Sequence, residues 1–298
     1  MNTARLRTVH DLLRFAANRF NQAGLSFGHG THNARDEAAY LILHALRLPL
    51  DQLEPCLDVP LNRKQITAVL KVLRQRVAKK IPAAYLTHEA WLGDLRFYID
   101  QRAIVPRSFI AELLRARLKP WIKDASAITA ALDLCTGSGC LAILMAQVFP
   151  NAVIDASDIS REALAVARRN IAAYGLEDRI NLIQSDLFKA LRGHRYDLIV
   201  ANPPYVSAQA MRALPAEFRH EPQLALDGGK DGLAYVRPIL QSAARHLRKN
   251  GLLVVEIGHN RKTLERAFPK TEFTWLNTSA GDNYVFLLKR EQLLIGLT

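Results

Sequence analysis

The chain has 298 residues, of which 49% are hydrophobic and 23% charged, and it contains 40 Lys and Arg against 28 Asp and Glu. This balance is typical of a globular chain of about two domains and excludes disorder as the main state. Three cysteines exclude a disulfide scaffold, and no run of about 18 uncharged apolar residues is present, so we expect no membrane-spanning helix. The N-terminal stretch has no apolar signal-peptide core. Its Arg-rich, amphipathic start also suits a mitochondrial transit segment, but we expect an ordinary first helix and a cytoplasmic protein.

Residues 1–88 are predicted to form a helical domain with three main helices. Thr8 can cap the first, whose apolar face is Val9, Leu12, Leu13, Ala16 and Phe20. The second has an apolar face at Ala38, Leu41, Ile42 and Ala45. Asn62 can cap the third, whose apolar face is Ile66, Val69, Leu70, Leu73 and Val77. The opposite face is expected to be solvated, because it contains a run of cations at Lys71, Arg74, Arg76, Lys79 and Lys80.

The positive charge is densest in this part of the chain. Residues 1–88 contain 13 Lys and Arg against 6 Asp and Glu. Such a field favours a polyanionic partner such as RNA, although a solvated basic surface without a partner has the same composition. No RNA-recognition or zinc-finger pattern accompanies the charge. His29, His32 and His44 lack the carboxylate or cysteine neighbours of a metal site, so no metal is expected.

Residues 89–106 are predicted to form a β-hairpin that connects two domains. Trp91, Leu95 and Phe97 lie on either side of a Gly93-Asp94 turn. A helix is expected over residues 109–118, with Pro120 just beyond its end.

Residues 107–298 alternate strand and helix patterns, which predicts an α/β domain with a doubly wound, mostly parallel sheet. The last two strands have no long helix between them, so we expect one to run antiparallel at the edge. Strands are expected over residues 130–134, 152–157, 180–184, 198–201, 252–257, 273–277 and 284–289. Helices are expected over residues 140–149, 161–174 and 233–247, with another beginning near His259.

A glycine-rich turn follows the first of these strands, over residues 133–140. Gly137 and Gly139 permit a tight turn that a ligand can approach closely. Asp158 ends the next strand, where a carboxylate can accept hydrogen bonds from both ribose hydroxyls of a nucleoside cofactor. This combination fits a dinucleotide as well as S-adenosylmethionine. Asp186 follows the third strand, where it could accept from an adenine amino group or cap a helix.

The tetrad Asn202-Pro203-Pro204-Tyr205 follows the fourth strand, at the sheet edge where such folds bind ligands. Each proline fixes its own φ and holds the preceding residue extended. The side-chain oxygen of Asn202 and the carbonyl of Pro203 are therefore two rigid acceptors for one planar –NH2 group, and Tyr205 can lie against its plane. Holding both hydrogens orients a poorly nucleophilic amide or aromatic amine, and orientation can contribute about 7–11 kcal/mol.

These motifs resemble the class I S-adenosylmethionine methyltransferases with an Asn-Pro-Pro-Tyr motif, and among them the protein glutamine N5-methyltransferases. The resemblance also covers residues 105–108 and 221–233, and so nearly the whole chain. It implies a Rossmann-like sheet, S-adenosylmethionine as cofactor with S-adenosylhomocysteine as product, and methylation of a glutamine side-chain amide. With Asp186 added, the expected cofactor-binding residues are Cys135, Thr136, Gly137, Ser138, Gly139, Asp158, Asp186 and Leu187. Substrate binding is assigned to Asn202, Pro203, Pro204 and Tyr205, with catalytic roles for Asn202, Pro203 and Tyr205.

Two branches of this family compete. Residues 134–140 and 105–113 look like the branch that methylates the third large-subunit ribosomal protein. The release-factor branch usually has Gly where Cys135 stands, Pro where Ser108 stands and often Trp where Leu187 stands, so Leu187 would give apolar contact rather than stacking. Arg107 could orient substrate or cofactor, or form a surface salt bridge.

The resemblance implies that residues 1–88 recognise the substrate. We therefore expect a large-subunit ribosomal protein as partner, with rRNA contact through the basic helices. Release factors, N6-adenine methylation of RNA or DNA, and a non-enzymatic role in ribosome assembly stay as alternatives.

Overall fold

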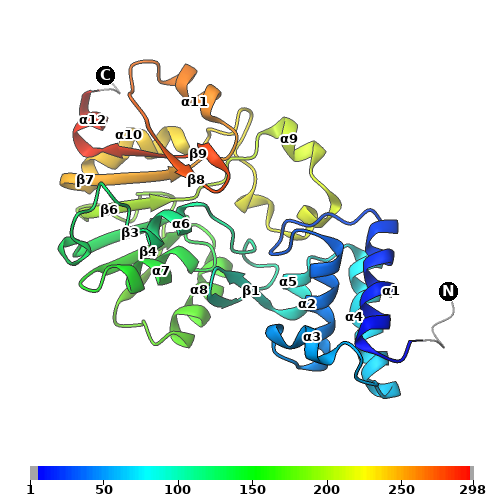
Figure 1. The fold of residues 1–298 in the computed structure, drawn as a ribbon. Coiled ribbons are helices and arrows are strands. Elements are labelled where there is room, and N and C mark those ends of the chain that lie inside the picture. Colours follow the sequence, from blue (N-terminus) through cyan, green and yellow to red (C-terminus); the bar gives the residue numbers. More distant parts are fainter. Residues whose placement is uncertain (1–5, 296–298) are drawn as a thin grey trace.

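The computed structural model describes residues 6–295, in which a helical bundle lies beside a larger α/β unit (Figure 1). Thr8 and Asn62 cap their helices as predicted, each in a capping box that satisfies two backbone N–H groups at the helix start. The residues predicted for the apolar face of the first helix are all buried. The bundle consists of α1 (Val9–Gln22), α2 (Ala34–Leu46), α3 (Leu53–Cys56), α4 (Arg63–Lys79) and α5 (Ala83–Thr87), with a short 3₁₀ helix η2 (Leu50–Gln52).

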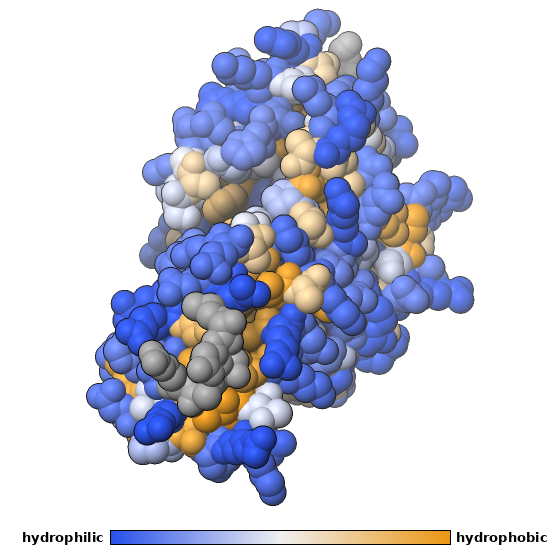
Figure 2. Space-filling view, turned by 90° about the vertical axis from the view of Figure 1, so that its right-hand side faces the viewer, coloured by the Kyte–Doolittle hydropathy of each residue, from blue (hydrophilic) through white to orange (hydrophobic). Residues whose placement is uncertain are grey.

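The cationic face of α4 is only partly solvated. Lys71, Arg74 and Lys79 are exposed, but Arg76 is fully buried, so its assignment to the solvated face was wrong. The helical repeat explains the difference, because position 76 lies three residues beyond buried Leu73 and so on the same face. Much of the outward side of the bundle is hydrophilic, with a few apolar groups between (Figure 2).

The predicted hairpin is present and links the bundle to the sheet. Strands β1 (Glu89–Leu92) and β2 (Leu95–Tyr98) pair antiparallel around the turn at Gly93 and Asp94. Leu92, Leu95 and Phe97 pack in the same core as α6 (Ile110–Arg115) and α7 (Cys140–Val148).

The seven-stranded sheet has the order β5-β4-β3-β6-β7-β9-β8 and confirms the predicted fold class. Its strands are β3 (Ala130–Leu134), β4 (Val153–Asp158), β5 (Ile180–Gln184), β6 (Tyr196–Ala201), β7 (Leu247–Glu256), β8 (Thr274–Thr278) and β9 (Gly281–Lys289). Strands β3 to β7 run parallel, and β9 runs antiparallel to both β7 and β8.

The antiparallel strand differs from the prediction in its place. We expected it at the edge, but β9 lies inside the sheet and β8 forms the edge. The burial patterns give the reason: β9 has four consecutive buried residues, as a strand covered on both faces requires, whereas β8 buries only Leu276.

Helices cover both faces of the sheet. One core joins α6, α7 and α8 (Arg161–Ala173) to one face, and a second joins α10 (Val236–His246), α11 (Arg261–Ala267) and α12 (Arg290–Ile295) to the other. None of the helices described over residues 6–295 combines the length and apolar character needed to cross a bilayer.

Residues 202–235 form a long insertion between β6 and α10, which the strand and helix patterns did not predict. It contains α9 (Ala208–Ala213) and the 3₁₀ helices η4 (Ala216–His220) and η5 (Gln223–Ala225). A further 3₁₀ helix, η3 (Ala125–Ala127), precedes β3. The insertion extends toward the helical bundle (Figure 1). The guanidinium of Arg76 joins them, since it donates to Glu37 Oε1 at 2.6 Å in α2 and to Glu217 Oε1 at 3.1 Å in η4.

Candidate active site

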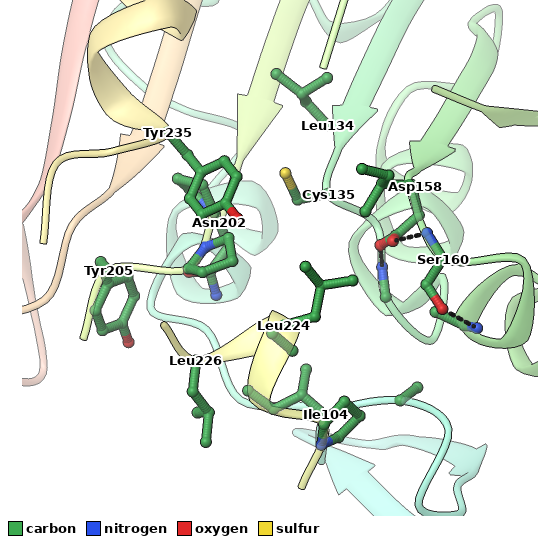
Figure 3. A pocket seen from close by; sticks show the side chains of 18 of the residues that line it. Ile104, Leu134, Cys135, Asp158, Ser160, Asn202, Tyr205, Leu224, Leu226 and Tyr235 are labelled. Atoms are coloured by element: carbon green, nitrogen blue, oxygen red, sulfur yellow. Dashed lines mark hydrogen bonds between the residues drawn. The ribbon is translucent and has the colours of Figure 1, made fainter. Parts of the chain in front are cut away.

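A cavity of about 500 Å³ lies at the carboxyl ends of β3 to β6. The strand order reverses between β3 and β6, and ligands of open α/β sheets bind at such a reversal. Asp158 lies on one side of the cavity, and Asn202 and Tyr205 lie on the other (Figure 3). The cavity therefore brings together the two predicted motifs.

Asp158 fixes the glycine-rich turn. Its two carboxylate oxygens accept from the backbone N–H groups of Gly137 and Ser160, each at 2.9 Å (Figure 3). Burial raises the pKa of Asp158 despite these hydrogen bonds, which act in the opposite direction. Gly137 has a φ of +57°, a conformation that favours glycine. The carboxylate is thus held in place at the cavity wall.

The other predicted cofactor residues divide into two groups. Cys135, Asp186 and Leu187 line the cavity together with Gly137 and Asp158. Thr136, Ser138 and Gly139 are not among the lining residues. These three residues contribute to the shape of the turn on the side away from the cavity.

Thr136 and Gly139 anchor the turn to the structure beneath it. The hydroxyl of Thr136 donates to Asp133 Oδ2 at 2.6 Å. A Cβ at Gly139 would lie 3.1 Å from the Cβ of Ala167, so the absent side chain lets the turn pack tightly on α8. Asp186 caps no helix, and its carboxylate pairs with Lys189 at 2.6 Å.

The side chain of Asn202 has one hydrogen bond and one unsatisfied atom. Its amide nitrogen Nδ2 donates to the carbonyl oxygen of Arg107 at 3.4 Å. Its oxygen Oδ1 is buried and has no hydrogen-bond partner within residues 6–295. A buried acceptor without a donor costs about 1–3 kcal/mol, so this oxygen is suited to receive an N–H from a ligand.

Tyr205 is held by the strand that ends beside it. A Cβ at Gly258 would lie 2.6 Å from Tyr205 Cε2, so only glycine permits the ring to lie there. The phenol donates to Glu256 Oε1 at 3.4 Å, and Asn260 Nδ2 donates to the Tyr205 carbonyl at 2.7 Å. Burial raises the pKa of Glu256 to about 7, although hydrogen bonds from Ser108 and neighbouring backbone groups oppose it. The sequence analysis missed Glu256, which lies at the end of an otherwise apolar strand.

Arg107 lines the cavity and forms a partly buried salt bridge rather than a surface one. Its guanidinium donates to both carboxylate oxygens of Glu221, each at 2.6 Å. The side chain of Glu221 is fully buried, and His29 of the helical bundle lies 3.5 Å from it. The stretch 221–233 stood out in the sequence, but nothing in it indicated this ion pair.

The insertion supplies an apolar wall that sequence reasoning also missed. Phe218, Leu224 and Leu226 line the cavity. Ile104, from the segment after the hairpin, lies on the same side of the cavity as Leu224 and Leu226 (Figure 3). Within the part of the chain that the structure describes, no group of three or more His, Cys, Asp or Glu side chains is arranged to hold a metal ion.

Comparisons with known proteins identify relatives of the chain. Residues 118–229 match the family described as Methyltransferase small domain. The ribosomal protein uL3 glutamine methyltransferase of Neisseria gonorrhoeae is 60% identical over 289 residues, which are 97% of this chain and 96% of that protein. The protein of the same name from Burkholderia pseudomallei is 54% identical and covers 96% of each chain.

Among solved structures, a methyltransferase from Pyrococcus furiosus is similar, with a TM-score of 0.48 and 17% identity, over 74% of this chain and 96% of that one. The identities to the full-length relatives decide the family. With its parallel sheet, its glycine-rich turn and its Asn-Pro-Pro-Tyr tetrad at one cavity, the chain is an enzyme that belongs to the family of ribosomal protein uL3 glutamine methyltransferases.

Proposed function

We propose that this protein transfers the methyl group of S-adenosylmethionine to the side-chain amide nitrogen N5 of a glutamine in ribosomal protein uL3. The names of the full-length relatives support the substrate. The buried, unsatisfied oxygen of Asn202 carries the chemistry, because it is an acceptor that awaits an N–H donor. A primary amide brings two such donors on one atom.

The half of the cavity around Asp158 fits the adenosine part of the cofactor. The Asp158 oxygens accept one backbone hydrogen bond each and keep lone pairs for ribose hydroxyls. Leu187 and Ile159 give an apolar surface for the adenine ring, and Asp186 can accept from its amino group. When bound, S-adenosylmethionine supplies an electrophilic methyl group on a positively charged sulfur.

The Asn202–Tyr205 tetrad orients the substrate amide. Oδ1 of Asn202 and the carbonyl of Pro203 accept its two N–H groups and so fix the plane of the nitrogen. Tyr205, which Gly258 allows to lie close, bounds that plane on one side. An amide nitrogen is a weak nucleophile, and holding it in a near-attack position lowers the barrier without a strong base. The proton leaves the nitrogen once the N–C bond has formed and the S–C bond has broken.

We also propose the division expected from the sequence: residues 1–88 recognise the substrate, residues 89–106 connect, and residues 107–298 bind cofactor and catalyse. The element bounds support it, since α5 ends at Thr87 and β1 begins at Glu89. The exposed cations Lys71, Arg74 and Lys79 are suited to contact rRNA near the target protein. An enzyme that methylates a newly synthesised ribosomal protein is expected to be cytoplasmic.

The test uses radiolabelled S-adenosylmethionine and ribosomes from a strain that lacks the gene. We expect label in uL3, and mass spectrometry should locate it on a glutamine side chain. Purified release factors and deproteinised rRNA serve as competing substrates in parallel reactions. Label that protease leaves intact but nuclease removes would reject the proposal in favour of adenine methylation, and label only in release factors would reject the substrate.

A further inference from the structure

The segment from Val105 to Phe109 runs past Asn202 and is held at both ends by buried carboxyl groups. Glu221 Oε1 accepts from the N–H of Val105 at 3.1 Å, and both Glu221 oxygens accept from the Arg107 guanidinium. Glu256 Oε2 accepts from the Ser108 hydroxyl at 2.6 Å and from the N–H of Phe109 at 2.9 Å. The main chain at Arg107 is therefore fixed from two sides.

This main chain gives the side chain of Asn202 its single hydrogen bond within the described residues. Nδ2 donates to the Arg107 carbonyl, and Oδ1 has no partner. The terminal torsion of an asparagine is broad and roughly two-fold, so the amide can also adopt the flipped orientation at little internal cost. The groups around Asn202 therefore determine which of the two amide orientations is adopted.

Only one orientation suits a substrate amide. With Nδ2 on the Arg107 carbonyl, the cavity receives the acceptor Oδ1, which can take an N–H of the glutamine. In the flipped orientation, Oδ1 would face the Arg107 carbonyl, acceptor against acceptor, and Nδ2 would face the substrate –NH2, donor against donor. The position of the Arg107 carbonyl thus decides whether Asn202 can bind the substrate.

Building on the proposed function, we propose that Glu221 is a positioning residue for Asn202, because it fixes the Arg107 carbonyl that keeps Oδ1 of Asn202 turned toward the substrate. In this role, the bidentate salt bridge keeps the guanidinium of a cavity-lining residue engaged with the protein. Glu221 is ionised as the role requires: burial opposes the charged form, but the hydrogen bonds and charge of Arg107, together with His29, lower its pKa to about 2.

The experiment compares Glu221→Gln with a matched control, Glu217→Gln. Glu217 lies in the same insertion and is likewise buried and paired with an arginine, Arg76. Within residues 6–295, the hydrogen bonds and ion pairs of Arg76 go to Glu37, Glu217 and the carbonyl of Ser26, and none reaches the 105–109 segment. For each variant, calorimetry with S-adenosylhomocysteine counts the folded, cofactor-competent molecules. Turnover on uL3 is then expressed per competent molecule, which removes losses that come from stability alone.

We expect Glu221→Gln to lower kcat per competent molecule by about 10–100-fold, since a displacement near 1 Å at a reacting group can cost that much. Cofactor affinity should change by less than about threefold, because Asp158 and Leu187 lie elsewhere. Glu217→Gln should keep kcat per competent molecule within about twofold. Equal kcat losses in both variants, or none in Glu221→Gln, would overturn the positioning role.

A second arm uses Asn202→Asp, whose carboxylate presents an acceptor in either orientation. In this background the residual activity should respond little to Glu221→Gln, so the two substitutions should be strongly non-additive. Additive losses would contradict the proposal. If Asn202→Asp has no activity, the comparison of Glu221→Gln with Glu217→Gln is the deciding test. Wild-type enzyme in the same assay separates the questions: if it fails to label a uL3 glutamine, the proposed function itself fails.

Discussion

The two halves of the cavity are built in different ways. In the half that we propose binds the cofactor, called the cofactor half, Asp158 accepts hydrogen bonds from Gly137 and Ser160, which are 21 and 2 residues away along the chain. In the half that we propose binds the substrate, called the substrate half, Arg107 donates to Glu221 across 114 residues, and Asn202 donates to the Arg107 carbonyl across 95. The half proposed to bind the cofactor is thus formed locally, by the ends of two strands. The half proposed to bind the substrate depends on the segment after the hairpin, on the insertion and, through His29, on the helical bundle.

The largest effect on turnover is expected at Asn202, in the substrate half. Asn202→Ala removes the acceptor for the substrate amide, and we predict a loss of kcat of about 10³-fold, comparable to losing one preorganised transition-state contact. S-adenosylhomocysteine affinity, measured by calorimetry, should change little because Asp158 is untouched. If Asn202→Ala lost S-adenosylhomocysteine affinity as well as turnover, the two halves would not act separately and the comparison between them would be wrong.

The next effect tests how firmly the insertion is tied to the bundle. Arg76→Gln leaves Glu37 and Glu217 buried without their cation, and breaking such a pair should lower the free energy of unfolding by about 3 kcal/mol. Arg74→Gln, on the exposed side of the same helix, should change it by less than about 0.5 kcal/mol. Urea unfolding followed by circular dichroism measures both. Similar stabilities for the two variants would contradict the buried role of Arg76.

Asp158→Ala tests the cofactor half alone. Loss of the ribose acceptors should weaken S-adenosylmethionine binding by about 10–100-fold, in line with hydrogen bonds to a charged group. At saturating cofactor, kcat on uL3 should stay within a fewfold of wild type. If titration with S-adenosylmethionine gave an unchanged affinity for Asp158→Ala, the assignment of Asp158 to the cofactor site would be wrong.

Glu256 gives the substrate half a pH dependence. Its folded-state pKa of about 7 exceeds the ordinary 4.5, so the folded protein keeps a proton that the unfolded chain releases between these values. Stability should therefore fall as the pH rises through this window, by an amount on the order of 1–3 kcal/mol. Asp133, whose pKa burial raises to about 7, acts in the same direction.

Glu256→Gln separates the two contributions, because glutamine does not titrate. Thermal unfolding between pH 4.5 and 7 should show a flatter dependence in this variant, with the slope from Asp133 left. An unchanged slope would mean that Glu256 does not hold its proton in the folded state.

The smallest effect concerns the exposed cations of the bundle. Neutralising Lys71, Arg74 and Lys79 to glutamine should leave methylation of isolated uL3 unchanged and slow methylation of an assembly precursor a fewfold, more so at low salt. If the variant and the wild type methylated the precursor at equal rates at low salt, the proposed rRNA contact would be rejected.

Much of the fold could be predicted from local patterns. The apolar runs gave β3 and β5 with their observed bounds, and the residue pairs around Gly93 and Asp94 gave the hairpin. The place of β9 could not be predicted from its own residues, since a buried run fits any interior position and pairing partners lie far away in sequence. The helical repeat places Arg76 on the buried face of its helix, but its two carboxylate partners come from other segments, so no local pattern indicated the ion pairs.

By itself, the sequence determined the glycine-rich turn, the carboxylate at the end of the next strand, and the tetrad with its two rigid acceptors. These are short stretches whose backbone geometry is set by glycine, proline and neighbouring residues. Only the tertiary structure decided what surrounds Asn202: the Arg107 carbonyl, the carboxyl groups of Glu221 and Glu256, and the apolar wall of the insertion. Each of these contacts joins segments distant in the chain, and burying a charge becomes favourable only when folding brings its partner to it.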